Sequence, residues 1–181
     1  PSSALGAFEA TPLEVAGAYT VFPGRGEWAR PSLVRAATDD GGKLLWNEDP
    51  ITVRRTSARA AWLATTLLEA VIDDGTGRAA RKLGVTGAVG GKTGTTDHER
   101  DAWFAGFTGE LAVAVWVGHD RGKVLGLTGA QAALPTWSHF VAGSGTAGDS
   151  FARPKGLVEI TVCTDTGRPP TAECGETTQA W

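Results

Sequence analysis

The run KTGTT at residues 92–96 combines residue types that can bind and polarise an anionic substrate. It lies where valine, glycine and threonine predict a β-strand, so its side chains should alternate between two faces. Thr93 and Thr95 then project together and can share a carboxylate, while Lys92 on the other face can bring positive charge to a neighbouring catalytic group. Gly94 leaves room for an extended peptide along the strand. The candidate substrate-binding residues are Thr93, Gly94, Thr95 and Thr96, and the candidate catalytic residues are Lys92 and Thr95.

The same residues have a plainer interpretation. Lys92 also fits an ordinary solvent-facing strand position, and both threonines have high β-propensity. On the triplet Lys-Thr-Gly alone we favour this interpretation, because three common residues recur by chance. The choice between the two therefore depends on the sequence around the triplet.

Other polar groups near the strand favour structural roles. Asp97, His98 and Glu99 form a polar loop tip, which we interpret as a solvated turn. Arg100 and Asp101 are interpreted as an ion-paired turn that leads into an aromatic strand. The Gly-Thr-Gly sequence at residues 75–77 follows a predicted helix, so it indicates a helix stop rather than a phosphate-binding loop.

Six of the seven tryptophans fall into two groups. Two of them can stack on carbohydrate if they are exposed, namely Trp46 and Trp181. Four others fall on the apolar phase of predicted elements and are expected in the core: Trp62, Trp103, Trp116 and Trp137.

The elements that must position the strand follow from hydrophobic periodicity and turn residues. Thr11, Pro12 and Glu14 predict a capping box on a short helix. The strongest helix signal covers 57–74, and a helix over 131–142 should kink or start late because it contains Pro135. Strands are expected in a hairpin over 30–49, in three antiparallel runs at 85–96, 101–109 and 111–120, and within 156–165 before an irregular end.

These elements define an expected fold class. We predict an α+β fold, in which helices pack on an antiparallel sheet. Residues 1–143 are expected to form this domain part, and residues 144–181 a linker, an extra strand and an irregular tail.

Composition limits the function classes. With 181 residues, 41% of them hydrophobic, the chain is expected to form one globular domain with a tail. A formal net charge of −3 without a basic block argues against nucleic acid as a partner. There is no apolar run of about 18 residues, so we expect no membrane contact by this chain itself. A chain that starts at Pro1 and has no methionine is expected to be a fragment whose membrane anchor lies upstream.

Cys163 and Cys174 lie close together near the end of the chain, where a disulfide would close a short loop. The sequence alone is equally compatible with a disulfide and with two free thiols. Zinc normally requires four ligands, and His98, His119 and His139 show no matching spacing. Neither a metal nor a cofactor is therefore expected.

Several blocks of the sequence resemble the class A penicillin-binding proteins, which are bifunctional peptidoglycan glycosyltransferases and transpeptidases. K-T-G is one of three motifs shared by penicillin-binding proteins and serine β-lactamases. The blocks LGAFEATPLEVAGAYTVF, DDGTGRAARKLG, GKTGTT with RDAWFAGFT and AVAVWVGHD, and TGAQAALPTWSHF look like blocks of that family, in the family's order. The resemblance covers nearly all of residues 1–143 and reverses the preference for the plainer interpretation.

The resemblance implies a partial penicillin-binding, β-lactamase-like fold and specific residue roles. In that family the lysine that matches Lys92 supports the serine of an S-x-N motif. The threonines that match Thr93 and Thr95 hold the terminal carboxylate of a D-Ala-D-Ala stem peptide or of a β-lactam. The backbone N–H at Thr95 is one of two oxyanion donors. Peptidoglycan stem peptides and β-lactams are the implied partners, at an extracytoplasmic site that favours a Cys163–Cys174 disulfide.

The sequence departs from the family at the nucleophile. No serine of the chain is followed by lysine three positions later or by asparagine two positions later. In the family those motifs precede the position of Pro1, in the upstream part of the same domain. Because acyl transfer needs an activated hydroxyl, we expect this chain alone to be inactive. Two alternatives stay open: a non-catalytic module that binds peptidoglycan peptides, and a β-lactamase or D,D-carboxypeptidase of the same superfamily.

Overall fold

The computed structural model describes residues 9–181, which belong to two compact units. The first unit ends at Phe151 and the second covers Ala152–Trp181. The helices of the first unit are α1 (Pro12–Tyr19), α2 (Ala58–Asp73), α3 (Ala79–Lys82), the 3-10 turn η2 (Asp97–Glu99) and α4 (Gly129–Ser144). Its strands are β1 (Glu27–Ala29), β2 (Ala36–Thr38), β3 (Leu44–Asn47), β4 (Thr52–Arg54), β5 (Gly90–Thr95), β6 (Asp101–Phe107) and β7 (Ala112–Gly118).

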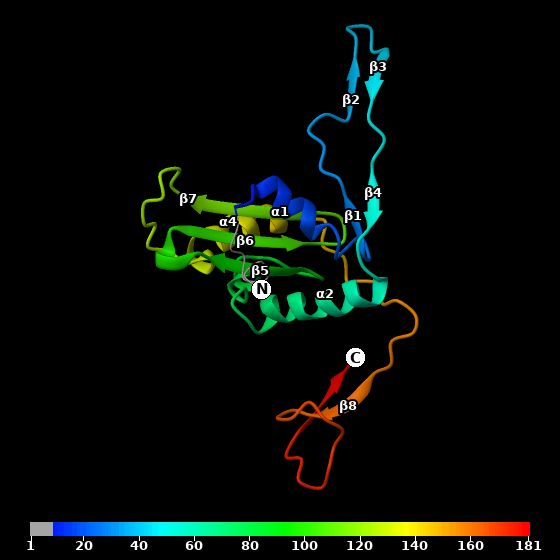
Figure 1. Cartoon of the computed structure of the whole chain (residues 1–181), viewed down its shortest axis with the longest axis vertical. Helices are drawn as coiled ribbons and strands as arrows, with labels where there is room; N and C mark the ends of the chain where they lie inside the picture. The colour runs from blue at the N-terminus through cyan, green and yellow to red at the C-terminus, as the bar shows by residue number, and fades with distance from the viewer. Residues whose placement is uncertain (1–8) are drawn as a thin grey trace. The chain divides into compact units, whose positions relative to one another are not determined.

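The centre of the first unit is a three-stranded antiparallel sheet in the order β5-β6-β7 (Figure 1). This confirms the predicted run of three consecutive strands. In its register Thr93 lies opposite Phe104, and Phe104 lies opposite Val115. α4 packs on one face of the sheet, and the aromatic rings of Tyr19 and Phe22, in and just after α1, pack against Phe107 on the other.

The core lies between the sheet and α4. The rings of Phe104 and Trp137 are fully buried, and their centroids lie 4.8 Å apart. Large buried side chains account for most of the hydrophobic stabilisation of a fold of this size. The residues that complete this cluster are Ile72, Ala80, Val85, Val89, Ala133, Leu134 and Val141.

The two N-terminal helix predictions are confirmed. The Thr11 hydroxyl accepts from the Glu14 N–H at 3.2 Å, and the Glu14 carboxylate accepts from the Thr11 N–H at 2.8 Å, which completes a capping box. The Ser57 hydroxyl caps α2 by accepting from the Ala60 N–H. α2 ends at Asp73, as its Gly-Thr-Gly stop predicts.

The last helix was predicted to kink or to start late, and the late start is not observed. α4 begins at Gly129, two residues before the predicted start, and Pro135 lies inside it. The Gln131 side-chain oxygen accepts from the Thr128 N–H at 3.0 Å and so stabilises the early start. An internal proline costs a helix about 3 kcal/mol, and the complete burial of Leu134 and Trp137 beside it offsets this cost.

The hairpin predicted over residues 30–49 is present as β2 and β3, which pair from Ala36↔Asn47 onward. The sequence analysis missed β1 and β4, which pair below it from Glu27↔Arg54 to Ala29↔Thr52. Figure 1 shows the two short ladders in succession, with β2 and β3 at the far end from the β5-β6-β7 sheet. β1 and β4 are each only three residues long, which is too short for a clear alternation of polar and apolar residues.

Only one of the four tryptophans expected in the core is fully buried, Trp137. Trp62, Trp103 and Trp116 are half-buried. Trp103 and Trp116 lie opposite each other on β6 and β7, with ring centroids 6.5 Å apart. The expectation of core positions was therefore wrong for three of the four, because the apolar phase of an element carries no information about how completely its neighbours cover it.

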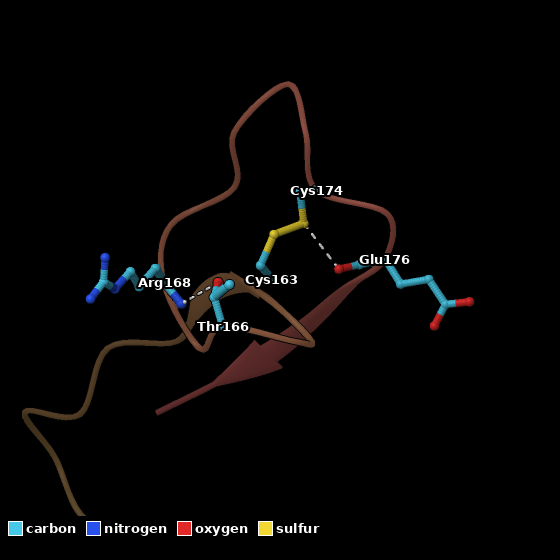
Figure 2. The surroundings of a disulfide bond; sticks show 5 residues. All are labelled: Cys163, Thr166, Arg168, Cys174 and Glu176. Carbon is cyan, nitrogen blue, oxygen red and sulfur yellow. Dashed lines mark hydrogen bonds between the residues drawn. A yellow bond between two sulfur atoms is a disulfide. The ribbon is translucent and has the colours of Figure 1, made fainter.

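The second unit contains a two-stranded sheet of β8 (Ile160–Cys163) and β9 (Thr177–Ala180). The strand expected within 156–165 is present as β8. The expected irregular end holds for residues 164–176 but not for Thr177–Ala180, which pair with Ile160–Cys163. Cys163 and Cys174 are joined by a disulfide, with Cα atoms 5.8 Å apart (Figure 2). The Cys174 sulfur lies 3.1 Å from the Glu176 carbonyl oxygen, just before β9.

Replacing Phe104 by alanine tests the core. We expect Phe104→Ala to lower the free energy of unfolding by about 3–5 kcal/mol, because it removes a fully buried ring from between β5 and α4. Phe140→Ala on α4 is the matched control, since that ring is 57% exposed and its loss should change stability by less than about 0.5 kcal/mol. Urea unfolding of both variants measures the difference, and equal losses would contradict this account of the core.

Reduction tests the second unit. A domain of this size buries little apolar surface, so loss of the Cys163–Cys174 disulfide should destabilise it by about 2–4 kcal/mol. We expect reduction to add the mass of two hydrogen atoms and to accelerate amide exchange in β8 and β9, while exchange in α2 stays unchanged. An unchanged mass would show that the thiols were free.

Candidate functional site

The candidate site lies on β5, the outer strand of the sheet that also contains β6 and β7. Lys92 and Thr95 are exposed, while Thr93 and Gly94 are half-buried. Beyond its pairing with β6, β5 has no second strand partner among residues 9–181. An outer strand of this kind presents backbone N–H and C=O groups to an extended peptide.

The two threonines of the run share one face of the sheet. Thr93 lies opposite Phe104 and Thr95 opposite Ala102, and side chains directly opposite in an antiparallel pair project to the same side. Lys92 lies opposite Ala105, on the other face. The strand therefore places Thr93 and Thr95 on one face and Lys92 on the other, as the sequence predicts.

The lysine ammonium nevertheless lies beside the first threonine. The Lys92 Nζ donates to the Thr93 carbonyl oxygen at 3.1 Å and to the Thr93 hydroxyl at 3.2 Å. A lysine side chain on an outer strand is long and flexible enough to fold back over the strand edge. The positive charge of Lys92 therefore lies next to the Thr93 hydroxyl, although the alternation of side chains places the two residues on opposite faces of the strand.

Thr95 is held by the first residue of α4. The Gly129 N–H donates to the Thr95 hydroxyl at 3.0 Å. A Cβ on Gly129 would lie 2.3 Å from the Trp103 carbonyl oxygen and 2.5 Å from that of Gly94, so only glycine allows this approach. The positive end of the α4 dipole therefore lies at Thr95 and favours an anion there.

Gly94 and Thr96 have structural contacts of their own. A Cβ on Gly94 would lie 3.1 Å from the Trp103 Cβ, so glycine also relieves a cross-strand contact. The Thr96 hydroxyl donates to the Asp101 carboxylate at 3.0 Å and accepts from the Asp101 N–H at 2.9 Å. The proton of the Thr96 hydroxyl is therefore used in a hydrogen bond that closes the turn between β5 and β6.

The polar loop after β5 is a turn, as expected. Asp97, His98 and Glu99 are exposed, and the Glu99 carbonyl accepts from the Leu125 N–H at 2.9 Å. The expected ion pair of Arg100 with Asp101 is absent from the described residues. The expectation was wrong because Asp101 bonds to Thr96 and to the Trp116 indole N–H, at 3.0 Å, instead.

A residue that the sequence analysis did not assign to the site also contacts it. The Thr76 hydroxyl, in the loop after α2, lies 2.8 Å from the Thr93 hydroxyl. The signal was present in the Gly-Thr-Gly sequence, which was interpreted only as a helix stop. Nearby on α2, burial raises the pKa of Glu69, and the Asp73 carboxylate acts in the same direction.

Comparison with known families identifies the class of protein. The family model described as "Penicillin binding protein transpeptidase domain" matches residues 2–133. The chain belongs to this family. Its α+β fold, with helices packed on an antiparallel sheet, is the fold of solved penicillin-binding proteins.

The individual relatives are class A proteins. The chain is 35% identical over 141 residues to penicillin-binding protein 1B of Vibrio cholerae, covering 78% of this chain and 18% of the relative. It is 37% identical over 142 residues to penicillin-binding protein 1A of Aquifex aeolicus, covering 77% and 19%. The chain thus spans about a fifth of the length of these curated relatives.

Two solved structures show the same fold. Penicillin-binding protein 1A from Haemophilus influenzae superposes with a TM-score of 0.87 at 27% identity, over 98% of this chain and 33% of that one. Penicillin-binding protein A from Mycobacterium tuberculosis, solved as an imipenem acyl-enzyme complex, has a TM-score of 0.57 at 29% identity, over 74% and 31%. Within residues 9–181, no helix is both long and apolar enough to cross a membrane.

Substitution of Gly129 tests the contact between α4 and β5. We expect Gly129→Ala to lower the free energy of unfolding by about 1–3 kcal/mol, because its Cβ would meet the backbone of Gly94 and Trp103. Gly143→Ala is the matched control in the same helix, where a Cβ meets nothing within 4 Å. Alanine there should stabilise the helix by up to about 1 kcal/mol. Chemical unfolding of both variants measures the two effects, and equal signs would contradict the structure.

Proposed function

We propose that this chain is the C-terminal, KTG-bearing part of a D,D-transpeptidase domain that cross-links peptidoglycan stem peptides by serine acyl transfer. The observation that carries the proposal is the group of hydroxyls and one ammonium on β5, in a chain that belongs to the transpeptidase family. The proposed substrate is the D-Ala-D-Ala end of a stem peptide, and β-lactams are the proposed inhibitors.

The geometry of β5 suits the capture of a terminal carboxylate. The Thr95 hydroxyl accepts from the Gly129 N–H, so its own proton remains available for a ligand oxygen. The Lys92 ammonium beside Thr93 adds positive charge to the same strand. Hydrogen bonds from hydroxyls to a charged group contribute about 1.5–3 kcal/mol each, so two threonines suffice to orient the substrate.

The proposed reaction has two steps. The oxygen of a serine upstream of this chain bonds to the carbonyl carbon of D-Ala-D-Ala, the peptide bond breaks, and D-alanine leaves with the proton. An amine of a neighbouring stem peptide then attacks the acyl-enzyme and displaces the serine. The Thr95 backbone N–H is the proposed oxyanion donor of this chain, a contribution of about 3 kcal/mol to transition-state stabilisation. Lys92 supports the upstream S-x-N serine electrostatically.

The site would be extracytoplasmic, since its substrate lies outside the cytoplasmic membrane. A Cys163–Cys174 disulfide is compatible with that compartment. The chain alone lacks Ser-x-x-Lys, so we expect it to be inactive until it is joined to the upstream part of the domain.

Fluorescent penicillin tests the function. A domain in which residues 1–181 follow a segment with Ser-x-x-Lys and S-x-N should form a stable acyl-enzyme. Thr93→Val in that domain should lower the acylation rate at least tenfold, because it removes a hydroxyl that binds the carboxylate. Absence of labelling in the wild-type domain, with the serine intact and the fold confirmed by circular dichroism, would refute the proposal.

The same experiment separates the alternatives. Rapid release of hydrolysed β-lactam would indicate a β-lactamase or carboxypeptidase. A saturable affinity of the isolated chain for D-Ala-D-Ala peptides, lost in Thr93→Val and without acylation of the joined domain, would indicate a binding module. The class A relatives favour the transpeptidase.

A further inference from the structure

The loop between α2 and α3 contacts the candidate site through the side chain of Thr76. The Thr76 and Thr93 hydroxyl oxygens are 2.8 Å apart, although the residues are 17 positions apart in the chain. This distance is a normal hydrogen bond between hydroxyls. Thr76 therefore interacts directly with a residue proposed to bind the substrate carboxylate.

The loop is built so that Thr76 has little freedom to move. A Cβ on Gly75 would lie 2.8 Å from the Val71 Cα, and one on Gly77 would lie 3.1 Å from both the Ile72 Cδ1 and the Val71 carbonyl oxygen. The Gly77 N–H donates to that Val71 carbonyl at 2.9 Å. The glycines thus allow the loop to close against the last turn of α2, which is anchored in the core by the fully buried Ile72.

Arg81 on α3 ties this helix end to the segment that leads into β5. Its guanidinium donates to the Asp73 carboxylate at 2.7 and 3.0 Å. It also donates to the Gly87 carbonyl at 2.9 Å. Because the same side chain holds the end of α2 and the approach to β5, the Thr76 loop and the strand keep a fixed spacing.

The hydrogen-bond capacity of Thr93 gives the contact a chemical meaning. A hydroxyl has one proton and two acceptor sites, whereas an ammonium can only donate. Lys92 therefore occupies one acceptor site of the Thr93 oxygen. If Thr76 donates as well, both acceptor sites are filled, and the Thr93 proton is left for an external acceptor.

We propose that Thr76 is a positioning residue, which donates to Thr93 and so directs the Thr93 proton toward the carboxylate of the ligand. The inference rests on the proposed function, because it takes the ligand to be a carboxylate bound at Thr93. The donor chain from Thr76 through Thr93 to an anion also strengthens each bond by polarisation. Thr76 itself does not touch the reacting atoms.

Acylation rates of the complete domain test the proposal, with a penicillin and its methyl ester as probes. Thr76→Val should lower the rate constant for the free acid roughly tenfold and leave that for the ester unchanged, because only the acid presents a carboxylate. Thr76→Ser, which keeps the hydroxyl, should restore the wild-type rate. Thr66→Val is the matched control on α2, where the Thr66 hydroxyl donates to the Leu63 carbonyl of its own helix.

Equal rates for wild type and Thr76→Val with the free acid would overturn the proposal. An equal loss with acid and ester would also overturn it, because it would indicate a general structural role. Failure of the wild-type domain to be acylated would refute the proposed function instead.

A measurement on residues 1–181 keeps these two failures apart. Three-bond couplings of the Thr93 methyl group report its χ1 rotamer in solution. We expect one rotamer in wild type and in Thr76→Ser, and averaging over several in Thr76→Val. An unchanged rotamer in Thr76→Val would overturn the positioning role, whether or not the domain is acylated.

Discussion

The close approach of Gly129 to the backbone of Gly94 and Trp103 is the constraint on which the candidate site depends. It brings the first N–H of α4 onto the Thr95 hydroxyl and sets where the helix starts. From that start, Trp137 reaches Phe104 in the core. The same helix therefore provides both the stability of the sheet and the orientation of one hydroxyl that is proposed to bind the substrate, so substitutions in its core contacts should affect both properties.

The candidate site is a set of threonine hydroxyls on β5 whose hydrogen-bond partners include groups on other elements. Thr95 is held by the start of α4, and Thr93 by Lys92 and by the loop after α2. In the proposed site, the Gly129 N–H fills one acceptor site of Thr95, and Lys92 together with Thr76 would fill both acceptor sites of Thr93, so that each hydroxyl would keep a proton for the ligand. Preorganisation of this kind lets a polar site bind an anion without first reorienting its own groups.

The sequence predicted the three central strands, α2, the capping box of α1 and the shared face of Thr93 and Thr95, because each rests on local periodicity or local capping. It did not predict the contact of Thr76 with Thr93, since that contact joins a loop and a strand through tertiary packing. The half-burial of Trp103 and the early start of α4 were missed for the same reason. Alternation and helix propensity are properties of a single element. The burial of a side chain and the close approach of two segments depend on the neighbouring elements.

The outer position of β7 has a consequence for work with the chain by itself. Its sequence AVAVWVG is uncharged and rich in β-branched residues, and no strand pairs with its outer edge within the described part of the chain. Exposed strands of this composition are templates for pairing between molecules. Residues 1–181 should therefore self-associate with rising concentration.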